Sequence, residues 1–198
     1  MYSRRSSGIF SFLRELPPEI SIPFGTLVRE IDELVRGFNR RFPKEVRCRP
    51  GCQDCCYALF DVSYLEALVI REAARALKRD QRREIERRSR KALKALGCLE
   101  PISDPFKIAQ KRVRCPLLGE DRLCLLYEVR PFTCRIYGLP VEIDGRARVC
   151  GFSGFEPGQK YPTIKWLSLK ERLERVSIKL SPQLGRRRFT LAEVLLNL

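Results

Sequence analysis

The chain has 198 residues, 44% of them hydrophobic, which predicts one globular domain with an apolar core. It has 39 Lys and Arg residues against 24 Asp and Glu, and the net charge of +15 favours nucleic acid, anionic lipid or an acidic protein as partner without choosing among them. No apolar run reaches the roughly 18 to 20 residues of a membrane-spanning helix, and the first residues lack the apolar segment of a signal peptide, so we expect a cytoplasmic protein without a membrane span.

The cysteine and histidine counts restrict the chemistry further. Nine cysteines and no histidine exclude Ser-His-Asp triads, Cys-His proteases and every zinc finger that needs a histidine ligand. In a reducing compartment, clustered cysteines are more typical of metal ligands or redox thiols than of disulfides. Any metal site in this chain must therefore be built from thiolates, with a carboxylate as the other available ligand.

The N-terminal residues 1–26 contain three prolines among short apolar pieces, which predicts an extended lead-in packed on the body. Residues 27–42 place apolar side chains at the spacing of one helix face, and Pro43 ends that predicted helix. We expect the main domain to span residues 27–198.

Residues 48–56 are crowded with cysteine, which predicts a loop that wraps a ligand rather than a regular element. Ser63 and Glu66 form a capping box, in which each side chain accepts a hydrogen bond from the other residue's backbone N–H. They predict the start of a helix over 63–96 with a polar second half, and Gly97 is its predicted end.

Residues 98–114 are predicted to be a connection, and residues 123–129 a short helix or a buried turn. Residues 141–149 alternate around Asp144–Gly145, a strong local signal for a β-hairpin. A basic amphipathic helix is expected over 164–180.

Together these elements predict a mainly α fold: a single helical domain with a cysteine-rich irregular loop core that binds metal, and a small β-hairpin. A second capping box at Thr190–Glu193 adds a short final helix. The loop core is expected to lie between the helices at 27–42, 63–96 and 164–180.

The densest group of cysteines comprises Cys48, Cys52, Cys55 and Cys56. This spacing lets several thiolates of one loop converge on a metal, and both structural zinc and iron–sulfur clusters usually take four ligands. Adjacent cysteines do not readily share one small ion, so Cys56 is expected either to serve a second site or to be buried.

A second set follows at wider spacing: Cys115, Cys124, Cys134 and Cys150. These wide spacings alone are weak evidence for a metal site. Because the chain has no histidine and already has one cysteine cluster, the four cysteines are nevertheless candidate ligands. We therefore predict that Cys48, Cys52 and Cys55 share a centre with at least one cysteine of this second set. Cys98 is interpreted as the odd, structural cysteine.

Three motifs resemble a known family. They are CRPGCQDCC at residues 48–56, RCPLL at 114–118 and CLLYEVRPFTCR at 124–135. Over residues 46–152 the chain is similar to the zinc- or iron-chelating cysteine-cluster family, the CxxCxxCC or YkgJ-type proteins. The resemblance implies a zinc ion or an iron–sulfur cluster, and one branch of the family is linked to lysine methylation of flagellin.

The resemblance also implies which cysteines bind the metal. The matching positions are Cys48, Cys52, Cys55, Cys56, Cys115, Cys124 and Cys134, and Cys150 is added from its place in the chain. The family often has glycine before the third cysteine of the first motif, where this chain has Asp54. Asp54 is expected either to change the loop backbone or to add an oxygen ligand.

Three more residues are candidates to stabilise thiolates at the metal centre, two by charge and one by a hydrogen bond. A four-thiolate zinc centre is formally −2, and burying it is costly unless cations and N–H donors surround it. Arg130 and Arg135 flank Cys134 and are candidates for this role, with solvated arginines as the alternative. Tyr127 is a candidate hydrogen-bond donor to a sulfur, with a half-buried core tyrosine as the alternative.

The leading hypothesis is a metal-binding protein whose zinc or iron–sulfur centre supports redox or group-transfer chemistry. The alternative is a structural zinc module whose basic surface binds nucleic acid or an acidic protein. A thiol switch at Cys55–Cys56 is a further option. The cysteine spacing also occurs in radical S-adenosylmethionine enzymes, but the strand–helix alternation of their barrels is absent. The sequence does not decide whether the protein is an enzyme.

Overall fold

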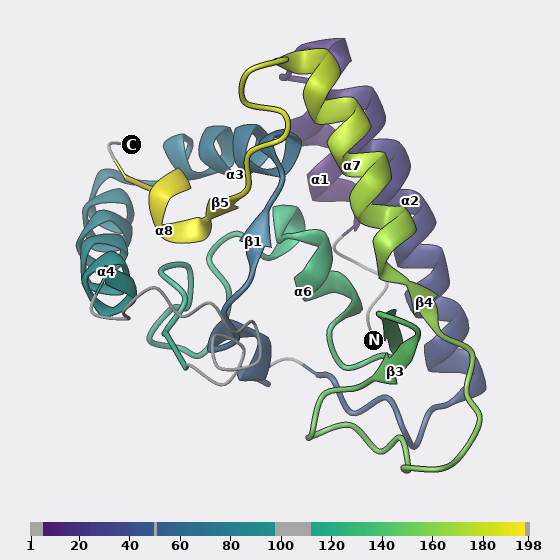
Figure 1. Ribbon diagram of the computed structural model, residues 1–198. Coiled ribbons are helices and arrows are strands. Elements are labelled where there is room, and N and C mark those ends of the chain that lie inside the picture. The colour runs from purple at the N-terminus through teal and green to yellow at the C-terminus, as the bar shows by residue number, and fades with distance from the viewer. Residues whose placement is uncertain (1–5, 50, 98–111, 197–198) are drawn as a thin grey trace.

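The computed structural model describes residues 6–49, 51–97 and 112–196, and helices dominate these ranges (Figure 1). The mainly α prediction is confirmed, and the small sheets have strands of two or three residues. None of the described helices combines the length and the apolar character needed to cross a membrane. One apolar core includes side chains from Ile9 near the N-terminus to Leu195 near the C-terminus.

The extended lead-in predicted for residues 1–26 is wrong, because two helices occupy its described part. Helix α1 spans Ser6–Leu13, and α2 spans Pro18–Arg41. Pro18 is the first residue of α2, where a missing N–H costs nothing because that group has no partner inside the helix. The helix therefore begins nine residues before the predicted position 27. Here Pro18 opens a helix and Pro23 lies inside it, so neither proline marks extended structure.

Helices α2, α3 (Tyr64–Arg75) and α7 (Trp166–Leu180) pack on one another and supply a large part of the apolar core. In Figure 1, α7 runs beside α2, and α3 crosses above the centre. Each large apolar side chain removed from water contributes roughly 1.5–3 kcal/mol before entropy is counted. The fully buried side chains on these helices include Phe24, Val28, Leu65, Ile70 and Leu173.

The single helix predicted over 63–96 is two helices, α3 and α4 (Arg79–Gly97). The break falls at Leu77–Lys78, where the Leu77 N–H bonds the Ala74 carbonyl and the Lys78 N–H bonds the Gln81 side chain. The polar residues in the second half of the predicted helix 63–96 do not indicate this turn. Helix α4 packs instead against α8 (Leu191–Val194), at the other side of the molecule from α2 in Figure 1.

The predicted β-hairpin is confirmed. Strand β2 (Val141–Ile143) pairs antiparallel with β3 (Arg146–Arg148), and β4 (Ile164–Lys165) adds a parallel strand. The two turn residues, Asp144 and Gly145, have φ of 52° and 71°. A two-residue type I′ hairpin turn requires positive φ at both positions, which Asp-Gly accommodates. The helix expected from 164 consequently begins at Trp166.

A second pair of strands joins distant parts of the chain. Strand β1 (Asp61–Val62) pairs antiparallel with β5 (Phe189–Thr190), and Arg188 bonds the Asp61 carboxylate at 2.7 Å. This pairing brings α8 beside the segment that leaves the cysteine loop. Local sequence patterns did not predict it.

The segments that carry the cysteines are mostly irregular and gather below α3, between α4 and α2 (Figure 1). They include the short helices η1 (Asp54–Cys56), η2 (Tyr127–Val129) and α6 (Phe132–Ile136). Helix η2 falls in the predicted short helix or turn at 123–129. Helix α6 was missed, because Pro131 was interpreted as the end of a helix and instead precedes one.

Candidate metal centre

Seven cysteines from four separate segments line a single cavity of about 320 Å³. They are Cys48, Cys52, Cys55, Cys56, Cys115, Cys124 and Cys134. The structure therefore brings the whole first cluster and three cysteines of the second set to one place. Cys98 lies outside the described residues.

The first and second clusters are joined by backbone pairing. The Cys115 N–H donates to the Cys56 carbonyl at 2.7 Å, and Val113 N–H donates to the Tyr57 carbonyl at 3.2 Å. An antiparallel bridge between Ala58 and Arg112 continues this contact. These bonds fix Cys115 beside the η1 cysteines despite the long stretch of sequence between them.

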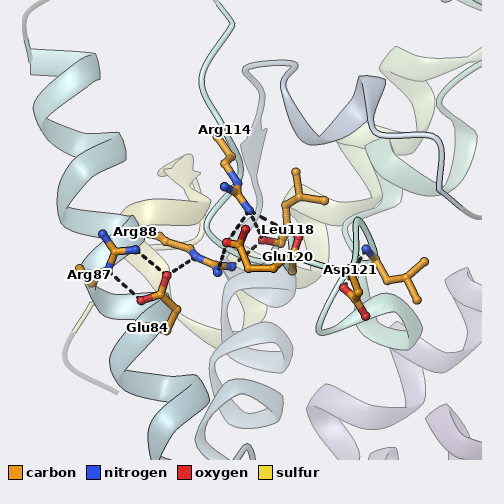
Figure 2. A network of polar contacts seen from close by, with 9 residues as sticks. Glu84, Arg87, Arg88, Arg114, Leu118, Glu120 and Asp121 are labelled. Carbon is orange, nitrogen blue, oxygen red and sulfur yellow. Dashed lines mark hydrogen bonds and ion pairs between the residues drawn. The ribbon is translucent and has the colours of Figure 1, made fainter.

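A closed loop holds Cys124 near Cys115. Leu118 and Cys124 form an antiparallel bridge, and the Leu125 N–H donates to the Leu117 carbonyl at 2.9 Å. The outer side of this loop is tied to α4 (Figure 2): Glu120 accepts hydrogen bonds from Arg88 at 2.7 Å and from Arg114 at 3.0 Å.

The fourth cysteine segment is α6, which positions Cys134. Its first N–H, on Phe132, donates to Glu66 Oε1 at 3.0 Å, and Glu66 also completes the predicted capping box at Ser63. Arg135 bonds Asp32 of α2 at 2.8 Å. Gly138 then turns the chain at φ 92°, and a Cβ there would lie 3.6 Å from that of Cys48. Helix α6 is thus fixed from both α3 and α2.

The thiols differ in depth. Cys48 and Cys52 are exposed and form the mouth of the cavity, whereas the other five lining cysteines are partly buried. All eight described cysteines are free thiols. The Sγ atoms of Cys55 and Cys56 lie 4.0 Å apart. Four sulfurs at 2.3 Å around zinc would stand about 3.8 Å apart, so this pair has the spacing of neighbouring ligands rather than of a disulfide.

The deeper thiols influence one another electrostatically. Burial raises the pKa of Cys115 to about 12 and that of Cys124 to about 11. By contrast, hydrogen bonds from Cys134 and Cys56 lower the pKa of Cys55, because both thiols stabilise its thiolate. Cys55 is therefore the natural first ligand of the set.

Cys150, an expected ligand, has a different position. It does not line the cavity, and its Sγ donates to Asp54 Oδ2 at 3.2 Å. The same oxygen accepts from Tyr137 at 2.9 Å, and Asp54 Oδ1 pairs with Arg112 at 2.6 Å. Burial alone would raise the pKa of Asp54, but the hydrogen bonds from Cys150, Arg112 and Tyr137 lower it. Asp54 thus joins four segments behind the cavity.

Comparison with known proteins agrees with this geometry. The model of the CxxCxxCC family, described as "Putative zinc- or iron-chelating domain", matches residues 47–151, more than half of the chain. The chain belongs to the CxxCxxCC family. The match confirms the expected segment of 46–152 to within a residue at each end. No curated protein and no solved structure matches it.

The arginines of this CxxCxxCC protein have distinct roles. Arg135 is almost fully buried and is held by Asp32 and by the Glu128 carbonyl. Arg130 stacks over the Tyr127 ring at 3.9 Å, and its charge opposes the rise in pKa that burial imposes on Cys48 and Cys124. Arg130 is therefore the better candidate to balance thiolate charge, and Tyr127 is its platform.

The donor set fits the zinc or iron named in the description of the CxxCxxCC family. All lining groups that can ligate a soft metal are sulfurs, and zinc and iron both accept all-thiolate coordination. In the described ranges, however, no three Cys, Asp or Glu side chains are already grouped to hold one metal ion. The sulfurs surround a space rather than a point.

Proposed function

We propose that this protein holds a polynuclear metal centre, an iron–sulfur cluster or more than one zinc ion, in the cysteine-lined cavity. The observation that carries the proposal is the convergence of seven thiols from four segments on one cavity. The proposed inner ligands are the partly buried cysteines: Cys55, Cys56, Cys115, Cys124 and Cys134.

Donor number and spacing favour several metal atoms over one. A single structural zinc takes four ligands at about 2.3 Å, which leaves no space inside the shell. Here the thiols exceed four, and they enclose about 320 Å³ without three of the described donors meeting at a point. A guest several atoms across can reach sulfurs on opposite walls of this space.

We further propose that the metal centre supports redox or group-transfer chemistry. An iron–sulfur cluster supplies an electron carrier when bound, and zinc supplies a Lewis acid. The chain's own contribution is contact with solvent at the edge of the site, because Cys48 and Cys52 are exposed. A centre that reacts with other molecules needs contact with solvent, and this exposure supports that role.

The structural zinc module with a basic surface is the weaker candidate. On α4, the most basic helix, Arg87 and Arg88 both bond Glu84, and Arg90 pairs with Glu86. All three pair with carboxylates of their own helix, which is typical of a solvated face, and Arg88 also bonds Glu120 outside it. Nucleic-acid binding thus remains a prediction without a structural observation behind it.

Elemental analysis and visible absorption of anaerobically purified protein test the proposal. We expect more than one metal atom per chain, with brown colour if the metal is iron. The matched variants are Cys134→Ser and Cys150→Ser, because each removes one thiol but only Cys134 lines the cavity. The first should lose metal and the second should keep it. Metal-free protein, a single zinc ion, or equal metal loss in both variants would refute the proposal.

A further inference from the structure

The cysteine-lined cavity also carries positive charge. Among the described lining residues, the charged side chains apart from the thiols are Arg49, Arg122, Arg130 and Arg135, and no Asp or Glu is present. Asp32 neutralises Arg135. In the described part of the chain, no carboxylate pairs with the other three. This cavity is thus a place where several unneutralised arginines converge.

Arg130 is held rigidly. Its guanidinium lies 3.9 Å from the centre of the Tyr127 ring, and its Nη1 donates to the Tyr127 carbonyl at 2.8 Å. A guanidinium carries five N–H donors in a flat fork, so most of them remain available. A pre-positioned fork of this kind binds a carboxylate or a phosphate with two parallel hydrogen bonds.

Arg122 occupies a turn that does not favour arginine. Its φ of 66° is left-handed, a conformation usually taken by glycine or asparagine. The side chain is placed over the first cysteine loop, because the Gln53 amide oxygen accepts from its Nη2 at 3.0 Å once that amide is oriented to suit both groups. The chain thus accepts an unfavourable backbone conformation at a residue that lines the cavity, which is typical of functional positions.

From these observations we infer that Arg122, Arg130 and Arg49 form an anion-binding subsite in the cysteine-lined cavity, for a small organic molecule with a carboxylate or phosphate group. Apolar side chains complete the wall, and about 320 Å³ lies at the lower end of small-ligand pockets. The inference deepens the proposed function and rests on it, because the anion would be held beside the metal centre. The apolar lining residues include Val35, Leu117, Pro131 and Leu139.

The competing explanation is that these arginines only balance thiolate charge. Arg130→Lys separates the two, because lysine keeps the charge and loses the flat fork. Charge balance would survive this change, whereas two-point anion recognition would not. Arg122→Gln tests the mouth of the cavity, and Arg175→Gln is the matched control, because Arg175 is exposed on α7 and does not line the cavity.

The test is calorimetric titration of the metal-loaded full chain with inorganic phosphate and with butyrate, at constant ionic strength in chloride. We expect one probe or both to bind, and Arg130→Lys and Arg122→Gln to weaken that binding about tenfold or more. Metal content should stay unchanged in both, and Arg175→Gln should bind like the wild type. The probe that binds identifies the ligand's anionic group.

Three results would overturn the inference: neither probe binds, Arg130→Lys binds like the wild type, or the variants lose metal and anion together. The last would assign the arginines to the thiolates. Metal-free wild-type protein would refute the proposed function instead, and the same titration would then test the anion subsite by itself.

Discussion

At the scale of single residues, one buried carboxylate determines where two helices begin. Glu66 accepts from Ser63 N–H at 2.7 Å at the start of α3 and from Phe132 N–H at 3.0 Å at the start of α6. Burial raises its pKa, and these hydrogen bonds act in the opposite direction. Because α6 carries Cys134, this helix cap also positions a candidate metal ligand.

Replacing Glu66 by alanine should therefore destabilise the protein more than an ordinary cap does. We expect Glu66→Ala to cost about 2–4 kcal/mol, because it leaves buried N–H groups of two helices without partners. The matched control is Glu193→Ala, which removes the exposed capping box at Thr190 and should cost about 1 kcal/mol. Denaturant unfolding measures both. Equal losses would contradict the double role of Glu66.

The buried thiols predict how metal binding depends on pH. With the pKa of Cys115 raised to about 12 and that of Cys124 to about 11, both thiols hold their protons at neutral pH. Each must lose its proton to bind zinc, so zinc affinity should rise with pH by about tenfold per unit for each proton released. Calorimetry in buffers of different ionisation enthalpy counts these protons.

Two cysteine variants serve as the test and the control for this titration. Cys115→Ser should release fewer protons than the wild type, whereas Cys150→Ser should release the same number, because Cys150 does not line the cavity. Zinc affinity that does not change with pH across the neutral range would contradict the account.

At the scale of elements, α4 holds the loop between Cys115 and Cys124 from outside. Arg88 donates to the Leu118 carbonyl at 2.5 Å and to Glu120 at 2.7 Å, and it also bonds Glu84 on its own helix (Figure 2). Only 11% of the Arg88 side chain is exposed. Its hydrogen bonds are therefore partly shielded from water and worth more than those of a surface pair.

Neighbouring arginines on α4 provide a matched test of this contact. Arg88→Ala should cost about 1–3 kcal/mol and speed hydrogen exchange of the Leu125 amide, which bonds the Leu117 carbonyl. Arg87→Ala removes a side chain that bonds only Glu84 in Figure 2 and should leave that exchange unchanged. If the two variants exchange alike, α4 does not stabilise the loop.

Elements with local signals were predictable from the sequence. The Asp-Gly turn and both capping boxes specify their structures within a few residues, and all three are confirmed. The break between α3 and α4 and the start of α6 depend on contacts that no local pattern shows, such as Glu66 with Phe132. Likewise, the sequence indicated that the cysteines converge, but not that Asp54 holds Cys150 away from the cavity.

At the scale of the whole molecule, the helices and the cysteine segments are organised differently. Helices α2, α3 and α7 bury side chains such as Phe24, Leu65 and Leu173 in an apolar core. The cysteine segments add side chains such as Leu117 and Phe132 to the same core, but they have little regular structure and also depend on short backbone pairings and on buried Glu66. A metal shared by their thiols would supply the cross-links that regular structure supplies elsewhere.

X-ray absorption at the metal edge of the anaerobically purified protein tests this central claim most directly. The account predicts a shell of sulfur neighbours at about 2.3 Å, with a second metal atom nearby. A shell of oxygen or nitrogen neighbours, or a lone metal atom without a metal neighbour, would contradict it.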